Sequence, residues 1–272
     1  MPELPEVETT RRGVAPRVLG RRIASVQVYD ARLRWPVPPD LASLIGGQTI
    51  RAVERRSKYL LFRMDAGTLL VHLGMTGSLR VYAEPPARRP HDHVDIALDS
   101  AVVLRYHDPR RFGAMLWIEG DPLRHPLLAN LGPEPLEPAF DVAYLYARTR
   151  GRRASIKVTL MDSHVVVGVG NIYANEALFR AGIRPATAAG KVSAPRLARL
   201  VTAVREVLRE AIDKGGSTLR DYVDSNGAAG MFQLHYHVYG REGLPCRHCA
   251  TPICVRRLGQ RSSFHCPRCQ PR

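Results

Sequence analysis

All five cysteines of this 272-residue chain lie within its last 27 residues, and four of them have a regular spacing. They form two pairs, Cys246-x2-Cys249 and Cys266-x2-Cys269, separated by 16 residues. This spacing is typical of four thiolates that hold one zinc ion in tetrahedral coordination. Because four thiolates fill the coordination of zinc, the ion would be structural and not catalytic. The segment between the pairs is long enough for a β-hairpin, so we predict a C-terminal zinc hairpin, with redox-active thiols as the alternative.

The chain is strongly basic. It has 40 Lys and Arg residues against 25 Asp and Glu, which gives a net charge of +15 and an isoelectric point near 10.2. A charge of this size favours a polyanionic partner, nucleic acid first and an anionic membrane second. Residues 241–272 contain seven arginines and one acid, a net charge of +6. We therefore expect the zinc hairpin to face DNA, with Arg261 near its tip as a phosphate ligand. The alternative is a charged surface that contacts only solvent.

The sequence has no sign of a membrane segment. No apolar run approaches the roughly 18 residues that a spanning helix needs, and the charged N-terminal region lacks the apolar stretch of a signal peptide. We expect a cytoplasmic protein that associates with the nucleoid through DNA and does not bind membranes. Nothing requires more than a monomer. Cys254, inside the hairpin, is not expected to bind the metal.

The first half of the chain has the pattern of a β-structure. After a helix predicted at residues 3–15, short alternating or apolar segments are separated by turn residues, which suggests an antiparallel sandwich or barrel. The eight predicted strands are Arg22–Tyr29, Thr49–Arg55, Tyr59–Met64, Thr68–Leu73, Ser78–Tyr82, His93–Leu98, Val102–Tyr106 and Ala114–Ile118.

The second half has the pattern of helices, so the predicted fold class is α+β. Proline-rich residues 122–138 indicate a domain boundary. Helices are predicted at Asp141–Thr149, Asn171–Ala181 and from Ser193 to about Lys214, the last with an apolar core-facing stripe. The Gly- and Ala-rich residues 220–231 are predicted to form a loop. The predicted domains are residues 1–135, 136–236 and 237–272.

The N-terminus carries a candidate nucleophile. Removal of Met1 would leave Pro2 with a free secondary α-amine, whose pKa of about 7.7–8 leaves part of it unprotonated at neutral pH. A lysine amine has a pKa near 10.4 and needs burial or a neighbouring cation to reach that state. Glu3 is next in the chain, where a proton shuttle would be needed. The alternative is that Pro and Glu only begin a helix.

Loops with glycine, basic and apolar residues suggest contacts with DNA. Gly168-Val169-Gly170-Asn171 precedes a predicted helix, whose N-terminus offers free N–H groups to a phosphate, although a tight turn explains the glycines equally well. Lys58 lies in a basic run before a strand. Met75, Arg110 and Phe112 lie in glycine-containing turns, where they suit insertion into a base stack beside an extruded nucleotide. The alternative is that Met75 and Phe112 face the core.

These motifs occur together in one order along the whole chain. They are Met1–Thr9, His72–Ser78, Asp108–Gly113, Gly168–Ala174 and the four-cysteine tail. In this combination the chain resembles bacterial formamidopyrimidine-DNA glycosylases, the 8-oxoguanine repair enzymes related to endonuclease VIII. The resemblance implies an N-terminal helix with an eight-stranded β-sandwich, a helical domain with a helix-two-turn-helix motif, and a zinc hairpin. DNA would lie between the two halves.

The resemblance also implies a reaction. The damaged nucleotide is flipped out of the duplex, and Pro2 attacks its C1′ and expels the oxidised base. Glu3 protonates the sugar ring oxygen, and the resulting iminium permits β- and then δ-elimination, which cuts the strand on both sides of the sugar. Glu6 would support the helix and the flipped nucleotide. The expected substrates are duplexes with 8-oxoguanine, formamidopyrimidine (Fapy) lesions or abasic sites.

Further roles follow from the same resemblance. Lys58 would hold phosphates at the catalytic site, with Asn171 and Arg261 as its partners. His72 would contact DNA, and Lys157 would lie near the lesion or its phosphates. Met75 and Phe112 would fill the gap in the duplex, and Arg110 would face the orphaned base.

Two positions depart from the family pattern. Met231 stands where an aromatic residue is frequent, and His235 stands near an expected acid, at the loop that covers the base and the strand after it. These differences affect the expected base preference and not the chemistry.

Two other functions remain open from the sequence. An endonuclease VIII-like enzyme would remove oxidised pyrimidines by the same chemistry, but its N-terminus and its inserted residues typically differ. A basic zinc-ribbon protein that binds DNA or ribosomes would explain the charge and the cysteines, but neither Pro2-Glu3 nor the inserted loops.

Overall fold

The computed structural model describes residues 2–217 and 230–271. The chain forms two compact units. The first unit consists of Met1–Ala129 and Lys214–Met231, and the second of Asn130–Asp213 and Phe232–Arg272. The three-domain division of the sequence stays a prediction. The loop expected at residues 220–231 lies outside the described residues except for Gly230 and Met231.

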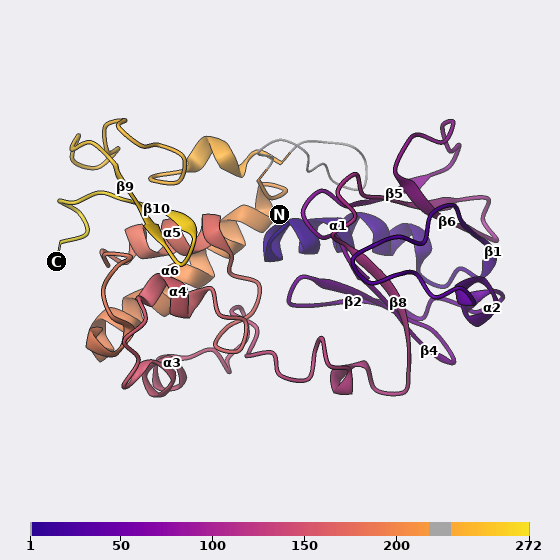
Figure 1. Cartoon of the computed structure of the whole chain (residues 1–272), viewed down its shortest axis with the longest axis horizontal. Coiled ribbons are helices and arrows are strands. Elements are labelled where there is room, and N and C mark those ends of the chain that lie inside the picture. Colours follow the sequence, from indigo (N-terminus) through magenta and orange to yellow (C-terminus); the bar gives the residue numbers. More distant parts are fainter. Residues whose placement is uncertain (1, 218–229, 272) are drawn as a thin grey trace. The chain divides into compact units, whose positions relative to one another are not determined.

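The first unit contains two four-stranded antiparallel sheets, which confirms the predicted sandwich (Figure 1). One sheet has the strand order β1-β6-β7-β5 and the other β2-β3-β4-β8. Each predicted strand overlaps an observed one: β1 Ile23–Val28, β2 Ala52–Arg56, β3 Tyr59–Arg63, β4 Gly67–His72, β5 Ser78–Tyr82, β6 Asp92–Leu98, β7 Val103–His107 and β8 Ala114–Glu119. Alternate side chains of both sheets form one core, because successive residues of a strand point to opposite faces.

Helix α1, Leu4–Val18, completes this core and packs against β2, β3 and β5. Its buried apolar residues include Leu4, Val7, Val14 and Val18, spaced so that they face the sheets. Two short helices were not predicted. They are α2, Leu41–Ile45, and the 3-10 turn η1, Pro122–Arg124.

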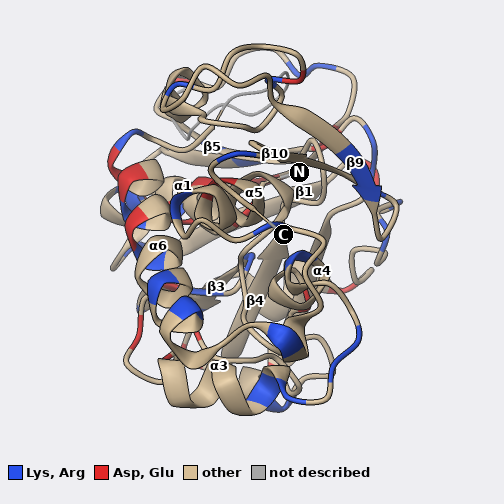
Figure 2. Ribbon diagram, turned by 90° about the vertical axis from the view of Figure 1, so that its left-hand side faces the viewer, with Lys and Arg blue, Asp and Glu red and all other residues tan. Residues whose placement is uncertain are grey.

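The second unit is helical, as predicted. Its helices are α3 Val142–Thr149, α4 Ile156–Leu160, α5 Asn171–Arg180 and α6 Ala194–Asp213, with 3-10 turns η2 Ala189–Lys191 and η3 Phe232–His235. Helix α6 buries the predicted apolar stripe against α5 and α3 and carries its charged residues on the opposite side (Figure 2). Helix α4 was not predicted. His235 lies in η3, so the expectation of a strand there is wrong.

The C-terminal hairpin is present. Strands β9, Cys254–Leu258, and β10, Arg261–His265, pair antiparallel across a two-residue turn. Both turn residues, Gly259 and Gln260, have positive φ values of 53° and 62°. This is the geometry of a type I′ turn, whose twist matches that of the strands.

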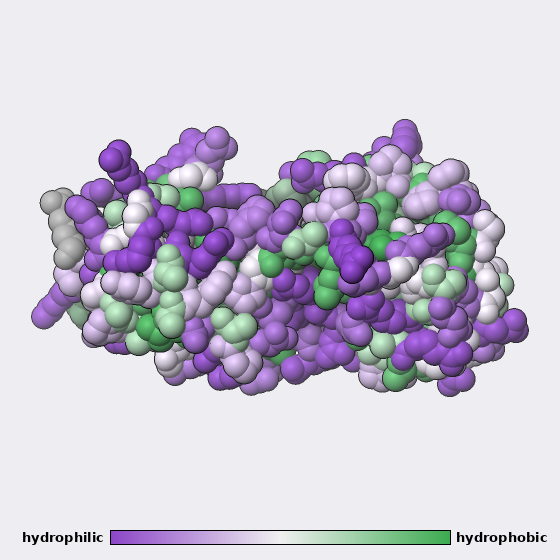
Figure 3. All heavy atoms as spheres, turned by 90° about the horizontal axis from the view of Figure 1, so that it is seen from below, coloured by the Kyte–Doolittle hydropathy of each residue, from purple (hydrophilic) through white to green (hydrophobic). Residues whose placement is uncertain are grey.

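One face of the molecule is drawn with its side chains in Figure 3. The face in Figure 3 is mostly hydrophilic, and its hydrophobic residues form small separate patches. Within residues 2–217 and 230–271, no helix is both long and apolar enough to cross a bilayer.

Candidate functional site

Pro2 and Glu3 lie at the N-terminus of α1. Pro2 is buried, and Glu3 is the N-cap residue, with an exposed fraction of only 3%. Glu3 and Glu6 form a reciprocal capping box, in which the Glu3 N–H donates to Glu6 Oε2 at 2.8 Å and the Glu3 carboxylate accepts from the Glu6 N–H. The backbone that carries the candidate nucleophile is therefore held rigidly against the first helical turn.

Glu6 joins this turn to a distant part of the first unit. Its Oε1 accepts a 2.8 Å hydrogen bond from the N–H of Ser217. Gly216 has a φ of +80°, and a Cβ atom there would lie 3.0 Å from Glu6 Oε1. Only glycine allows this approach without strain. The expectation that Glu6 supports the helix is confirmed. Its role toward a nucleotide stays a prediction.

Lys58 lies at the tip of the β2–β3 hairpin. The two-residue turn Ser57-Lys58 has a φ of 57° at Ser57, where a residue with a side chain costs about 1–2 kcal/mol. Arg55 stabilises the turn by donating to the Ser57 carbonyl at 2.9 Å, and its Nε lies 3.3 Å from Glu8 Oε2. Glu8 belongs to α1, so this ion pair joins the hairpin of Lys58 to the helix that begins at Pro2.

Glu8 is ionised in this setting. Burial acts to raise its pKa, but the hydrogen bonds and charges of Arg11, Arg12 and Arg55 outweigh burial and lower the pKa below the ordinary value. The closest of these contacts is Arg11 Nη2 to Glu8 Oε1, at 2.8 Å. The sequence did not indicate this cluster, because Glu8 and Arg55 are 47 residues apart.

His72 lies at the end of β4, near Lys58. Burial, together with the charges of Lys58 and Arg34, lowers the pKa of His72 to about 4, so the ring is neutral at physiological pH. The Gly74 N–H donates to its Nδ1 at 3.2 Å, which leaves the proton on Nε2. The ring also contacts that of Tyr59, with centroids 4.8 Å apart. His72 can therefore act as a neutral N–H donor. Arg34 is a neighbouring cation that the sequence did not indicate.

The loops with Met75, Arg110 and Phe112 lie side by side in the first unit. Phe112 is 42% exposed, so its side chain does not enter the core, and Met75 is half-buried. The exposed Arg110 places its guanidinium carbon 4.8 Å from the centre of the Phe112 ring. A Cβ atom on Gly74 would lie 2.5 Å from the backbone of Phe112 and Gly113, which explains the glycine.

Asp108 connects the two loops. Its side chain is fully buried, and its Oδ1 accepts from the Thr76 hydroxyl at 2.8 Å and the Arg110 N–H at 3.3 Å. Its Oδ2 accepts from the Gly113 N–H at 2.8 Å and the Tyr106 hydroxyl at 3.5 Å. A buried carboxylate needs several hydrogen-bond donors to replace the water it has lost, and Asp108 has these four. The sequence placed Asp108 in a turn but did not indicate this role.

Asn171 lies in the second unit, at the first position of α5. The preceding Gly170 is the N-cap, and Gly168 has a φ of 75°, so the glycines form the predicted turn into a helix N-terminus. The Oδ1 atom of Asn171 is buried and has no hydrogen-bond partner within residues 2–217 and 230–271. Asn175, one turn further along α5, binds the C-terminal hairpin: its Oδ1 accepts a 2.8 Å hydrogen bond from the Phe264 N–H.

Lys157 contacts the C-terminal hairpin. It is fully buried in α4, and its Nζ donates to the Ser262 carbonyl at 2.8 Å and to Ser263 Oγ at 2.6 Å. These bonds hold β10 against α4. The expected position of Lys157 near the lesion or its phosphates stays a prediction. Arg261, immediately before these serines, is exposed and follows the type I′ turn.

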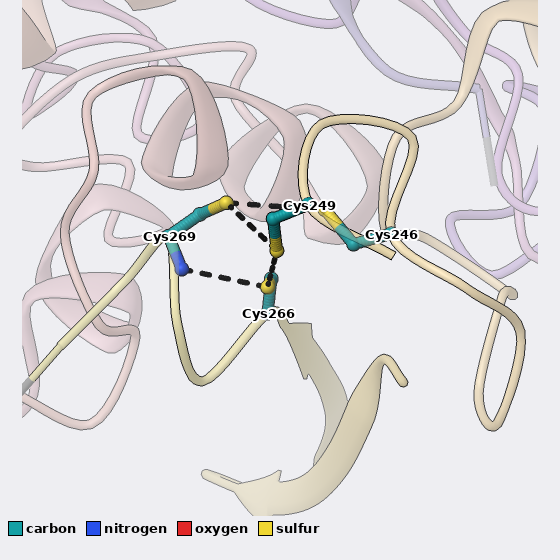
Figure 4. A group of neighbouring side chains, drawn as sticks. All are labelled: Cys246, Cys249, Cys266 and Cys269. Carbon is teal, nitrogen blue, oxygen red and sulfur yellow. Dashed lines mark hydrogen bonds between the residues drawn. The ribbon is translucent and has the colours of Figure 1, made fainter. Parts of the chain in front are cut away.

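The four predicted metal ligands come together. Cys246 and Cys249 lie on one loop and Cys266 and Cys269 follow β10, and their sulfur atoms point toward one another (Figure 4). Three of the Sγ–Sγ distances are 3.4, 3.5 and 3.9 Å, and all four atoms lie within 4.8 Å of one another. Thiolates bound to one zinc ion at about 2.3 Å would be about 3.8 Å apart.

The surroundings of the sulfurs also fit a metal ion. The N–H groups of His248 and Cys269 donate to the sulfurs of Cys246 and Cys266, both at 3.4 Å. Burial raises the pKa of Cys266 and of Cys269, whereas the hydrogen bonds with Thr251 lower the pKa of Cys249 to about 6. Cys254 is exposed and does not belong to the cluster, as expected.

A buried carboxylate on α5 binds the segment that precedes the first cysteine pair. Glu176 accepts three backbone hydrogen bonds of 2.8–3.0 Å, from the N–H groups of His237, Val238 and Tyr239. Burial nevertheless raises its pKa. This contact fixes the segment between η3 and the first cysteine pair. Met231 and His235, the two departures from the family pattern, are exposed.

The predicted site residues therefore form two groups. Pro2, Glu3, Lys58, His72 and the inserted loops belong to the first unit, and Asn171, Lys157, Arg261 and the cysteines belong to the second.

Comparison with known proteins identifies the family. Residues 1–115 match the formamidopyrimidine-DNA glycosylase N-terminal domain, and residues 131–223 match the H2TH domain of the same enzymes. The formamidopyrimidine-DNA glycosylase of Thioalkalivibrio sulfidiphilus is 59% identical over 270 residues, which cover 99% of this chain and all of the relative. The crystal structure of the MutM (Fpg) protein of Thermus thermophilus is 43% identical, with a TM-score of 0.87 over 99% of this chain and 98% of that one.

The Fpg protein of Lactococcus lactis is also similar. A mutant in complex with Fapy-dG DNA is 33% identical and has a TM-score of 0.92 over the full length of both chains. The same protein has been solved with DNA containing an abasic site and with DNA containing an oxidised pyrimidine. The two domain matches, the relatives that align over nearly their whole length and the four-cysteine hairpin all indicate the same family. The chain belongs to the formamidopyrimidine-DNA glycosylase family.

Proposed function

We propose that this protein is a bifunctional DNA glycosylase and AP lyase that removes oxidised purines, 8-oxoguanine and Fapy lesions, from duplex DNA. The observation that supports this most directly is the placement of Pro2 and Glu3 at the N-terminus of α1. The Lactococcus neighbour, crystallised with Fapy-dG and abasic DNA, supports the substrate class.

The nucleophile is the nitrogen of Pro2 after removal of Met1. The N-terminus of a helix carries a partial positive charge, which disfavours an ammonium group and so favours the free amine. The amine attacks C1′ of the flipped nucleotide, and the bond between C1′ and the base breaks. Because Pro2 is a secondary amine, opening of the sugar ring gives an iminium that stays cationic without losing a proton. This cation withdraws electrons from the sugar and permits β- and δ-elimination.

Glu3 is the proton donor to the ring oxygen of the sugar. Its N–H is bound to Glu6 and its carboxylate caps α1, so both groups that act on the sugar are attached to one rigid turn. Such positioning reduces the entropic part of a barrier. Lys58 and His72 contribute a cation and a neutral donor for the phosphates, and Asn171 and Arg261 contribute further phosphate contacts.

The exposed Phe112 and Arg110 support the assignment of the inserted residues. An aromatic side chain with an arginine against its face is suited to fill the space of an extruded nucleotide, with the guanidinium directed to the orphaned base. Met75, on the loop fixed by Asp108, completes this set.

The metal of the four-cysteine site is proposed to be one zinc ion. The four sulfurs leave no ligand position for substrate, so the ion stabilises the hairpin that presents Arg261. The protein is proposed to act as a monomer.

The test is covalent trapping. The protein is incubated with borohydride and a duplex carrying 8-oxoguanine opposite C, an oxidised pyrimidine, or an abasic site. We expect an adduct on the 8-oxoguanine duplex, and loss of the adduct but not of DNA binding when Met1 is retained. The absence of an adduct on every substrate would refute the enzymatic function.

The same experiment tests the second candidate, a glycosylase for oxidised pyrimidines. The structure of the Lactococcus protein with an oxidised pyrimidine favours keeping this possibility. Stronger trapping on the pyrimidine duplex than on the 8-oxoguanine duplex would replace the purine assignment.

A further inference from the structure

A buried amide in the second unit links the start of α5 to the strand that carries Arg261. Asn175 lies on α5, one turn after Asn171, and its side chain is fully buried. Its Nδ2 donates to the Asn171 carbonyl at 2.6 Å, and its Oδ1 accepts from the Phe264 N–H at 2.8 Å. Phe264 belongs to β10, which begins at Arg261 and lies beside α5 (Figure 1).

The bond to Phe264 acts on the edge of β10 that β9 leaves open. Leu258 and Arg261 flank the two-residue turn and face each other in the register of the hairpin. Such a flanking pair is hydrogen-bonded, and every second residue after it also directs its backbone groups to the partner strand. Ser262 and Phe264 therefore direct theirs to the opposite edge. There β10 is bonded to α4 at Ser262 and to α5 at Phe264.

The amide of Asn175 can satisfy both partners in only one way. An N–H group must meet its oxygen and a carbonyl must meet its nitrogen, so the side chain cannot turn over without losing both bonds. Because the side chain is buried, no water replaces a lost partner. A shift of β10 relative to the first turn of α5 would break one of the two bonds. Asn171 and β10 are therefore held in a fixed relation.

A second buried amide holds the hairpin without reaching Asn171. Gln270 is also fully buried, and its Oε1 accepts from the Cys266 N–H at 3.0 Å. Its Nε2 donates to the Ile183 carbonyl at 2.8 Å. Gln270 thus supports the hairpin in the same manner as Asn175, from the other end of β10. The bond to Asn171 distinguishes Asn175 from a residue that only stabilises the hairpin.

We propose that Asn175 is a positioning residue that couples Asn171 and Arg261, so that these two residues bind DNA phosphates as one unit. The inference rests on the proposed function, in which both residues contact phosphates. Two contacts that are already fixed relative to each other lose less conformational freedom on binding than two independent ones. Loss of one contact then leaves the phosphates poorly placed for the other, and the two contributions are not additive.

The experiment measures this coupling by binding to a duplex with an uncleavable tetrahydrofuran abasic analogue. Asn171→Ala and Arg261→Ala are made singly and together. In the wild-type background each single variant is expected to bind roughly tenfold more weakly, and the double variant only about twofold to threefold more weakly than either. Asn175→Asp keeps the acceptor for the Phe264 N–H but has no donor for the Asn171 carbonyl. In the Asn175→Asp background the two single losses should multiply.

The matched control is Gln270→Glu, which exchanges an amide for a carboxylate at the other end of β10. Both carboxylate variants should lose thermal stability and keep one equivalent of zinc, but only Gln270→Glu should retain the non-additivity of the wild type. A merely structural role of Asn175 would move both variants alike. Asn175→Ala removes both bonds without adding a charge and should behave as Asn175→Asp does.

Three results would overturn the proposal. The single losses multiply or are absent in the wild-type background, the non-additivity survives in both Asn175 variants, or Gln270→Glu abolishes it equally. Because only binding is measured, a wild-type protein that forms no borohydride adduct would refute the proposed enzyme and leave the coupling result separate.

Discussion

The hydroxyl of Thr76 donates a 2.8 Å hydrogen bond to the carboxylate of Asp108, 32 residues further along the chain. This bond joins the loop of Met75 to the loop of Arg110 and Phe112. The same carboxylate accepts from the Gly113 N–H at 2.8 Å, and Gly74 touches the backbone at Phe112. The two loops therefore form one rigid body, and we infer that they enter DNA together.

Thr76→Val should separate the two loops with little change in side-chain volume. Loss of a hydrogen bond to a buried carboxylate is expected to lower the free energy of unfolding by about 1.5–3 kcal/mol. Binding of a duplex with an abasic analogue should weaken more than binding of an undamaged duplex, because only the first requires the inserted residues. Thermal unfolding and binding titrations with both duplexes check this.

The control for Thr76→Val is Thr149→Val. Thr149 is also fully buried, but its hydroxyl bonds within α3, to the Tyr146 carbonyl. This variant should lose stability without changing the ratio of the two affinities. An unchanged ratio in Thr76→Val as well would show that the bond stabilises the fold without positioning the loops.

The ring of His72 should remain neutral over the physiological range. Its pKa of about 4 in the folded protein lies below the ordinary value near 6.5, so protonation favours the unfolded chain. The stability that it contributes is complete above pH 6.5 and is lost as the pH falls through 4. NMR titration of the ring should give a midpoint near pH 4, with the proton on Nε2 at neutral pH.

His72→Gln is the variant that isolates this effect. Glutamine keeps an acceptor and a donor but does not titrate, so the difference in unfolding free energy between the variant and the wild type should change between pH 6.5 and 4. A midpoint near 6.5, with DNA affinity that rises as His72 becomes charged, would contradict the assignment of a neutral donor.

The sequence was sufficient for the elements whose pattern is local. Eight strands, α1, α3, α5, α6 and the cysteine hairpin each follow from alternation, helical spacing or ligand spacing within one segment. The helices α2 and α4 were not predicted, because five residues make only about one and a half helical turns. So short a segment does not show the periodic spacing of apolar residues that indicates a helix. The strand expected at His235 came from the family resemblance and not from a pattern in this chain, and the structure has the 3-10 turn η3 there.

The candidate site was predictable in its residues but not in its contacts. Lysine is rarely buried, and the sequence did not indicate the burial of Lys157, because its partners Ser262 and Ser263 lie more than 100 residues away. The donors of Asp108 come from positions 76, 106, 110 and 113, and the partner of Glu6 is Ser217. Such bonds depend on tertiary packing, which a single sequence does not reveal.

Glu8→Gln should disturb the hairpin of Lys58. The variant removes the negative charge that pairs with Arg11, Arg12 and Arg55. We expect the free energy of unfolding at pH 7 to fall by about 1–3 kcal/mol. The pKa of Glu8 is lowered in the folded protein, so its stabilisation is present above the ordinary value of 4.5 and disappears as the pH falls through the folded value. Wild type and variant should therefore converge in stability below pH 4.5. A stability difference that persists in acid would contradict the charge-based explanation.

Lys157→Met should weaken the attachment of β10 to α4. Methionine has a similar stem but no donor, which removes the bonds to the Ser262 carbonyl and Ser263 Oγ. Unsatisfied buried polar groups cost about 1–3 kcal/mol each. We expect lower stability and weaker binding of damaged and undamaged duplexes alike, since Arg261 is displaced. The exposed Lys191→Met is the control and should change neither. Normal stability of Lys157→Met with selective loss of lesion binding would show that Lys157 acts on the lesion or its phosphates and not through β10.

Removal of the metal should unfold the hairpin and release Arg261. We expect one equivalent of zinc per chain, and Cys249→Ala should abolish stoichiometric zinc binding, because three thiolates no longer complete the tetrahedron. DNA affinity should fall in the variant and in the chelator-treated protein, with a smaller salt dependence as phosphate contacts are lost. Cys254→Ala removes an exposed thiol from the same hairpin and should retain both zinc and affinity. Undiminished DNA binding after measured loss of zinc would show that the hairpin does not contribute to the interface.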